Sequence, residues 1–156
     1  MMIAPRSFPS QQRMRLLGLP MAVALLGCVD SIEHDQARAA KRAEEFVQVA
    51  FVKGDGERGY GLLAPATKRY VSLEQFKRVV ARMHPQAAPK SVRVLEFEPM
   101  KGEKAIYVYL SGENSGEWFH YRITLEGTAK TDYGVLKFER SNEPYPGSSD
   151  RKKTGE

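Results

Sequence analysis

The spacing of apolar residues changes once along the chain, and this change constrains the fold more than any other feature. Between residues 33 and 83 apolar residues recur at helical spacing, whereas after the segment PQAAPKS (residues 85–91) they alternate with polar residues. Helical spacing indicates amphipathic helices, and alternation indicates strands with one buried face. The sequence therefore predicts an α+β domain in which helices precede an antiparallel sheet.

The first predicted helix spans residues 33–53. Asp30 and Glu33 have the spacing of a capping box, in which two side chains bond each other's backbone N–H groups at a helix N-terminus. Gly54 follows the helix directly and is a typical stop signal. The apolar stripe of this helix is expected to pack in the core.

A second helix begins with the clearest local signal in the chain. Ser72 is its predicted N-cap, and Gln75 is the reciprocal capping-box residue. Pro85 ends the helix, because a proline disfavours helical geometry in the residue before it. Residues 54–71 lie between the two helices, and their glycines and proline allow only a short helical turn.

Four later segments alternate between apolar and polar residues and are bounded by turn-forming residues. They predict an antiparallel meander of strands 91–98, 104–111, 118–126 and 133–140. The folded domain is thus expected at residues 33–140, a length sufficient to bury a single core. Residues 141–156 have almost no apolar content and are predicted to be a disordered tail.

One face of the two central strands is predicted to be buried. A four-residue loop at 113–116 sets a register that brings their apolar residues together: Ile106, Val108, Leu110, Phe119, Tyr121, Ile123 and Leu125. Tyr121 is the only polar member, and a buried tyrosine is more often a hydrogen-bonded core residue than a catalyst. No catalytic residue is therefore predicted, although an inward-pointing Glu96 or Asp132 would favour an enzyme.

The opposite face of these strands carries aromatic and basic residues. They are Tyr107, Tyr109, Trp118, His120 and Arg122, with Tyr109 expected opposite His120 and Tyr107 opposite Arg122. Tyrosine, tryptophan and arginine are enriched in protein interfaces. These five residues form the candidate interaction face, although aromatic residues also favour half-exposed strand positions without any function.

Residues 1–27 have the composition of a secretory signal rather than of a folded element. Three arginines and no acidic residue accompany an uncharged run, LLGLPMAVALL (residues 16–26). This run is shorter than the span of about 20 residues that crosses a bilayer as a helix. The segment ends in Leu-Leu-Gly, followed by Cys28, the only cysteine of the chain.

This ending resembles the lipobox of bacterial lipoproteins, which implies that Cys28 is lipidated. In that family the signal is cut before the cysteine, the thiol receives a diacylglycerol, and the new amine is usually acylated with a fatty acid such as palmitate. Two or more acyl chains anchor a protein stably without spanning the membrane. Residues 28–32 would then be a lipidated tether, and Val29 after the cysteine favours the outer membrane, with the domain in the periplasm.

Charge and residue spacing do not support nucleic-acid, metal or cofactor binding. The formal net charge of +5 falls to about +2 when the three arginines of the signal are removed. His34, His84 and His120 lie far apart in the sequence, so no metal site is predicted. The glycine-rich segment GDGERGYG lacks the lysine and serine of a phosphate loop.

The order of these features resembles small nuclear transport factor 2-like domains. The resemblance covers about residues 33–140 and rests on short features: Gly54-Asp55, Tyr60, Leu62-Leu63, Ser72 to Phe76 and the strands that follow. It implies a curved four-stranded sheet wrapped around the helices into a cone, often with a pocket and often dimeric through the sheet. Such domains include ketosteroid isomerases and dehydratases, and also many domains without catalysis.

These patterns together predict a membrane-anchored envelope lipoprotein whose domain is a non-catalytic binding module. The expected partner is a second copy of the chain or another envelope protein, bound through the sheet, and no cofactor is expected. A carrier of a small apolar ligand, using the interior of the cone, is the first alternative. An enzyme of the ketosteroid isomerase or dehydratase type is the second.

Overall fold

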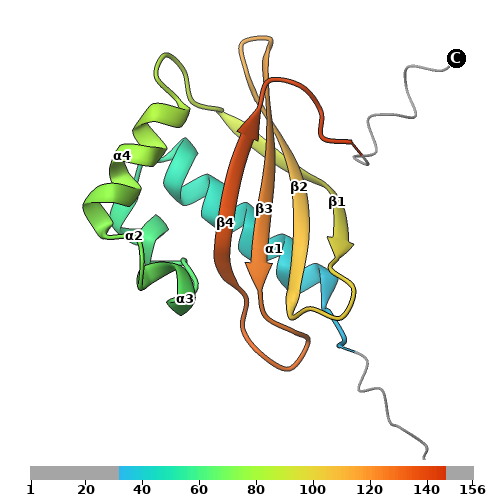
Figure 1. Cartoon of the computed structure of the whole chain (residues 1–156). Coiled ribbons are helices and arrows are strands. Elements are labelled where there is room, and N and C mark those ends of the chain that lie inside the picture. The colour runs from blue at the N-terminus through green and yellow to red at the C-terminus, as the bar shows by residue number, and fades with distance from the viewer. Residues whose placement is uncertain (1–31, 147–156) are drawn as a thin grey trace, which may run out of the picture. The chain divides into compact units, whose positions relative to one another are not determined.

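The computed structural model describes residues 32–146, which form helices followed by a four-stranded antiparallel sheet (Figure 1). This order confirms the predicted α+β class. The helices are α1 (Gln36–Val47), the π-helix η1 (Gln48–Val52), α2 (Gly56–Gly61), α3 (Pro65–Lys68) and α4 (Leu73–Met83). The strands, in their order across the sheet, are β1 (Ser91–Pro99), β2 (Ala105–Asn114), β3 (Glu117–Glu126) and β4 (Gly134–Ser141).

The first helix begins later than predicted. Its N-cap is Asp35, whose carboxylate accepts a hydrogen bond from the backbone N–H of Arg38 at 3.0 Å. Glu33 lies before the helix and takes no part in a capping box, while Asp30 lies outside the described residues. The C-terminal end agrees with the prediction, because Gly54 follows η1 with a φ of +66°, which favours glycine.

The capping box at the start of α4 is confirmed. The hydroxyl of Ser72 accepts a hydrogen bond from the N–H of Gln75 at 3.2 Å, and the side-chain oxygen of Gln75 accepts one from the N–H of Ser72 at 2.8 Å. The helix ends at Met83, before His84 and Pro85, as predicted. Two short helices, α2 and α3, lie where a single helical turn was expected.

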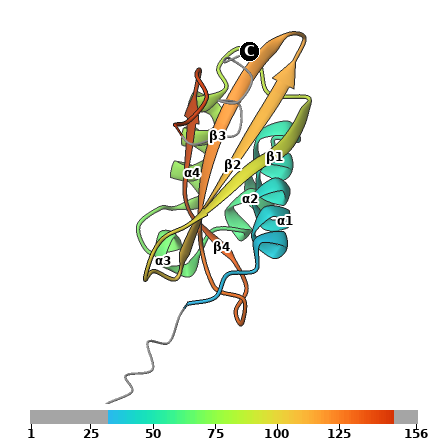
Figure 2. The same cartoon turned by 90° about the vertical axis from the view of Figure 1, so that its right-hand side faces the viewer.

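The long helix α1 packs along one face of the sheet and crosses all four strands (Figures 1 and 2). This inner face carries the apolar set predicted from alternation, and every member is fully buried. The shorter helices lie at the β4 side of the sheet, where α3 contacts β4. Part of the free edge of β4 is paired there, because the backbone of residues 62–64 forms two hydrogen bonds with the backbone of Val135.

The hairpin between β2 and β3 corrects the predicted register. Asn114 pairs with Glu117, so the loop contains two residues, Ser115 and Gly116, instead of four. Both have a positive φ, +55° and +88°, which is the geometry of a two-residue turn whose twist matches that of the strands. Each pairing therefore moves by two residues. Since side chains alternate with a period of two, every residue stays on its predicted face.

A β-bulge in β1 determines where its acidic residues point. The register shifts between Val94 and Glu96, so Leu95 is an extra residue of β1. Beyond the bulge, Phe97 packs against the core, while Glu96 lies on the outer face. Asp132, the other acidic residue considered for catalysis, forms an exposed ion pair instead. Glu96 is half-buried, and its Oε2 atom is buried without a hydrogen-bond partner among the described residues, whereas the carboxylate of Asp132 is exposed.

Candidate interaction face

The residues of the candidate interaction face all lie on the outer face of the sheet, away from α1: Tyr107 and Tyr109 on β2, and Trp118, His120 and Arg122 on β3. The observed register gives these residues other cross-strand partners than predicted. Tyr109, not Tyr107, lies opposite Arg122, and Ser111, not Tyr109, lies opposite His120. The predicted pairs were wrong because the hairpin loop is shorter than expected, whereas the choice of face depended only on alternation.

Arg122 contacts an acidic residue and two aromatic rings. Its Nε and Nη2 atoms donate to one carboxylate oxygen of Glu139 at 2.9 and 2.7 Å. Lys137 Nζ lies 2.9 Å from the other oxygen of Glu139. The guanidinium carbon lies 5.2 Å from the ring centroid of Tyr107 and 5.1 Å from that of Tyr145. Arg122 thus pairs its charge with an acid and offers its remaining surface to aromatic rings.

The charges of this network are maintained at neutral pH. The hydrogen bond to Glu139 is the main cause that raises the pKa of Arg122. Burial alone would raise the pKa of Glu139, but the hydrogen bonds from Lys137 and Arg122 lower it overall. The outer face therefore presents paired charges here rather than an isolated one.

Tyr109 is only 4% exposed, although it lies on the outer face. Its hydroxyl donates to a carboxylate oxygen of Glu98 at 2.8 Å, and its ring centroid lies 6.4 Å from that of Tyr107 and 5.8 Å from that of Tyr145. Burial, assisted by Glu98, raises the pKa of Tyr109 to about 12. The hydroxyl stays protonated at neutral pH and acts as a hydrogen-bond donor, not as a base.

Trp118 lies near the hairpin and is 49% exposed. Arg93 of β1 lies over its ring, at 5.6 Å from the centroid, and donates from Nε to the hydroxyl of Ser111 at 2.9 Å. An open hollow of about 460 Å³ adjoins the ring, lined by Ser91, Val92, Arg93, Ser111, Gly112, Glu113 and Trp118. This end of the face thus combines an exposed aromatic ring with a hollow beside it.

Three contributors to this face were missed by the sequence reasoning: Arg93, Glu98 and Tyr145. Tyr145 belongs to the segment predicted to be a disordered tail, yet its ring packs against residues of β2 and β3; residues 147–156 lie outside the described part. Its neighbours Pro144 and Pro146 restrict the backbone, and they are the one signal that could have marked it.

A second polar pair, formed by the half-buried His84 and the fully buried Tyr121, lies beside the core at the end of α4. Nε2 of His84 lies 2.7 Å from the hydroxyl of Tyr121, and its ring centroid lies 4.9 Å from that of Phe51. Burial, followed by the charge of Arg140, lowers the pKa of His84 to about 4, and burial also raises the pKa of Tyr121. The imidazole is therefore neutral at neutral pH. The sequence placed His84 only at a helix end.

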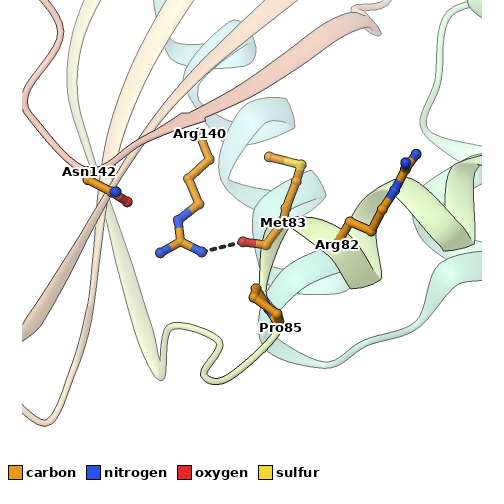
Figure 3. A pocket seen from close by; sticks show the side chains of 5 residues that line it. All are labelled: Arg82, Met83, Pro85, Arg140 and Asn142. Carbon is orange, nitrogen blue, oxygen red and sulfur yellow. Dashed lines mark hydrogen bonds between the residues drawn. The ribbon is translucent and has the colours of Figure 1, made fainter.

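An open hollow of about 460 Å³ lies beside the end of α4, lined by Arg82, Met83, Pro85, Arg140 and Asn142 (Figure 3). Nη1 of Arg140 donates to the carbonyl oxygen of Met83, and Nη2 lies 3.5 Å from a carboxylate oxygen of Glu117. Its guanidinium carbon lies 4.6 Å from the ring centroid of Phe119. Arg140 thus ties β4 to the C-terminal end of α4, where the carbonyl groups favour a positive charge.

Neither the described residues nor comparison with other proteins identifies a known class of site. Within residues 32–146, no helix has both the length and the hydrophobicity that a membrane span requires. The same stretch contains no group of three or more His, Cys, Asp or Glu residues arranged to hold a metal ion. Cys28 and the predicted signal segment lie outside the described residues. No protein-family model matches the sequence, and comparisons with curated proteins and with solved structures found no match.

Proposed function

We propose that this protein is an envelope lipoprotein, anchored through lipid on Cys28, whose α+β domain binds a protein partner through the outer face of the sheet. The anchor would hold the domain at the outer membrane, facing the periplasm. Its support is the N-terminal sequence: a basic segment, a short uncharged run, a small residue and the sole cysteine. The domain is proposed to act without catalysis, cofactor or nucleic acid.

The observation that supports partner binding is the arginine–aromatic cluster on the two central strands, formed by Tyr107, Tyr109 and Arg122. The exposed Trp118 lies on the same face of the sheet, towards the hairpin. Such side chains contribute most of the binding energy in many protein interfaces. The cluster lies on paired strands, so its side chains are held in place before binding, which reduces the entropy lost on association.

A second copy of the chain is the partner proposed first. The outer face carries Arg93 and Arg122 as well as Glu98 and Glu139. Arg122 and Glu139 already pair within one chain, but a face with charges of both signs can also meet opposite charges across a two-fold axis. We also propose that the fold is nuclear transport factor 2-like, because helices precede a four-stranded meander. In that family, domains often pair through this sheet.

Substitution of Arg122 tests the proposed face. We would compare the intact chain with Arg122→Ala and with the control Arg69→Ala, whose arginine is exposed after α3. Self-association is measured by sedimentation, and binding to immobilised chain is measured in detergent-solubilised envelopes. Arg122→Ala should weaken binding by about 2 kcal/mol, or roughly 30-fold, while Arg69→Ala changes nothing. Equal binding by a folded Arg122→Ala variant would contradict the proposal.

One observation favours the small-ligand carrier or the enzyme as a second candidate. The neutral imidazole of His84 is hydrogen-bonded to the hydroxyl of Tyr121, among apolar residues. A polar pair in such surroundings can form part of a ligand-binding or acid–base site. Native mass spectrometry of the purified chain would test this. A retained small molecule that His84→Gln releases would support it, whereas the mass of the protein and its own lipid alone would contradict it.

A further inference from the structure

The chain turns back after β4, and the segment that follows lies on the side of the sheet away from α1 (Figure 2). Among residues 142–146, only Tyr145 is partly buried, and its four neighbours are exposed. Its ring contacts Tyr109 and Arg122, with the centroid 5.8 Å from the Tyr109 ring and 5.1 Å from the guanidinium carbon. Tyr145 is thus the residue of this segment that docks on the sheet.

The sequence around Tyr145 favours docking of an extended segment. Pro144 and Pro146 flank it. A proline fixes its own φ and pushes the preceding residue towards an extended conformation. A segment restricted in this way loses little conformational entropy when it binds, which is the basis on which aromatic grooves recognise proline-rich ligands.

The docking site, defined as Tyr107, Tyr109 and Arg122, suits an aromatic ring better than an anion. Nε and Nη2 of Arg122 donate to Glu139, whose carboxylate balances the positive charge, and the guanidinium carbon lies over the rings of Tyr107 and Tyr145. The nearby carboxylate of Glu139 would also repel an acidic ligand. Burial, followed by the charge of Glu139, raises the pKa of Tyr145, so the docked hydroxyl stays neutral.

We infer that the docking site recognises a proline-flanked tyrosine, and that Tyr145 occupies it as an internal ligand in competition with the partner. The inference rests on the proposed function, which is partner binding through the outer face. It adds the class of ligand that this face binds, an extended segment with a tyrosine between two prolines. The apparent affinity for such a segment falls in proportion to the fraction of molecules in which the site is vacant. Removal of Tyr145 therefore strengthens binding.

The test uses the full chain in detergent, with a synthetic peptide of the sequence of residues 141–148 as the probe. Tyr145→Ala vacates the docking site, and Tyr70→Ala is the matched control, because Tyr70 is 83% exposed. Binding is followed by NMR through the Nε–H signal of Arg122. We expect a saturable shift with Tyr145→Ala and a response about tenfold weaker, or more, with the intact chain and with Tyr70→Ala.

A second probe, in which alanine replaces the tyrosine of the peptide, should leave the Arg122 signal of every variant unchanged. Equal responses of the intact and Tyr145→Ala chains, a response to the alanine peptide, or no response from any variant would each overturn the inference. These outcomes are distinct from failure of the proposed function. In that case neither self-association nor capture of an envelope protein would depend on Arg122, whatever the peptide does.

Discussion

At the scale of single residues, the half-buried imidazole of His84 should make the protein sensitive to acid. Its pKa is about 4 in the folded state, whereas histidine in an unfolded chain has a pKa near 6.5. The unfolded chain therefore binds the proton more readily. This contribution to stability is complete above about pH 6.5 and is lost as the pH falls towards 4.

We predict that lowering the pH from about 7.5 to about 5 reduces the free energy of unfolding by up to about 2 kcal/mol through His84. Urea denaturation at the two pH values measures this change. His84→Gln keeps a hydrogen-bonding group near Tyr121 but cannot titrate, so it should lose this part of the pH dependence. His34→Gln, at a hydrogen-bonded histidine outside the core, should keep it. The same pH dependence in His84→Gln as in the parent chain would contradict the prediction.

Single residues also show what a sequence can and cannot predict. Alternation is a local property of a strand, so it placed Trp118 and Arg122 correctly on the outer face. The contact of His84 with Tyr121 joins residues 37 positions apart, and it depends on how α4 packs against the sheet. The contact of Tyr145 with Arg122 depends on the path of the chain after β4. Local patterns carry no information on either.

At the scale of elements, the predicted boundaries were best where the signal was a local hydrogen-bond motif. The ends of α4 were predicted from Ser72, Gln75 and Pro85, because caps and prolines act within a few residues. The hairpin register was wrong because Ser115 adopts a positive φ, which no residue preference there required. The bulge at Leu95 was not predicted either, although the apolar positions change there from even (Val92, Val94) to odd (Leu95, Phe97), as one inserted residue requires.

The N-cap of α4 allows a direct test at this scale. Ser72→Ala removes the hydroxyl that accepts from the N–H of Gln75, so it should lower the free energy of unfolding by about 1 kcal/mol. Ser91→Ala, at an exposed strand residue, is the matched control and should change it much less. Chemical denaturation measures both. An unchanged midpoint with an unchanged slope for Ser72→Ala would show that the cap contributes nothing.

At the scale of the whole molecule, the proposed anchor decides where the domain works. Cys28→Ala should abolish attachment of the diacylglycerol, since the thiol that receives it is gone, and should leave the precursor uncut. Labelling of growing cells with a radioactive fatty acid measures this, with the intact chain as the reference. Labelling of Cys28→Ala equal to that of the intact chain would exclude the anchor.

The outer face of the sheet can be observed directly through Trp118, the only tryptophan of the chain. Incorporation of 5-fluorotryptophan gives the protein a single fluorine NMR signal, from a side chain that is 49% exposed in the isolated domain. If a partner covers this face, the signal should shift or broaden when the protein is concentrated or when solubilised envelopes are added, and Arg122→Ala should prevent the change. A sharp signal that responds to neither treatment would contradict binding through the outer face.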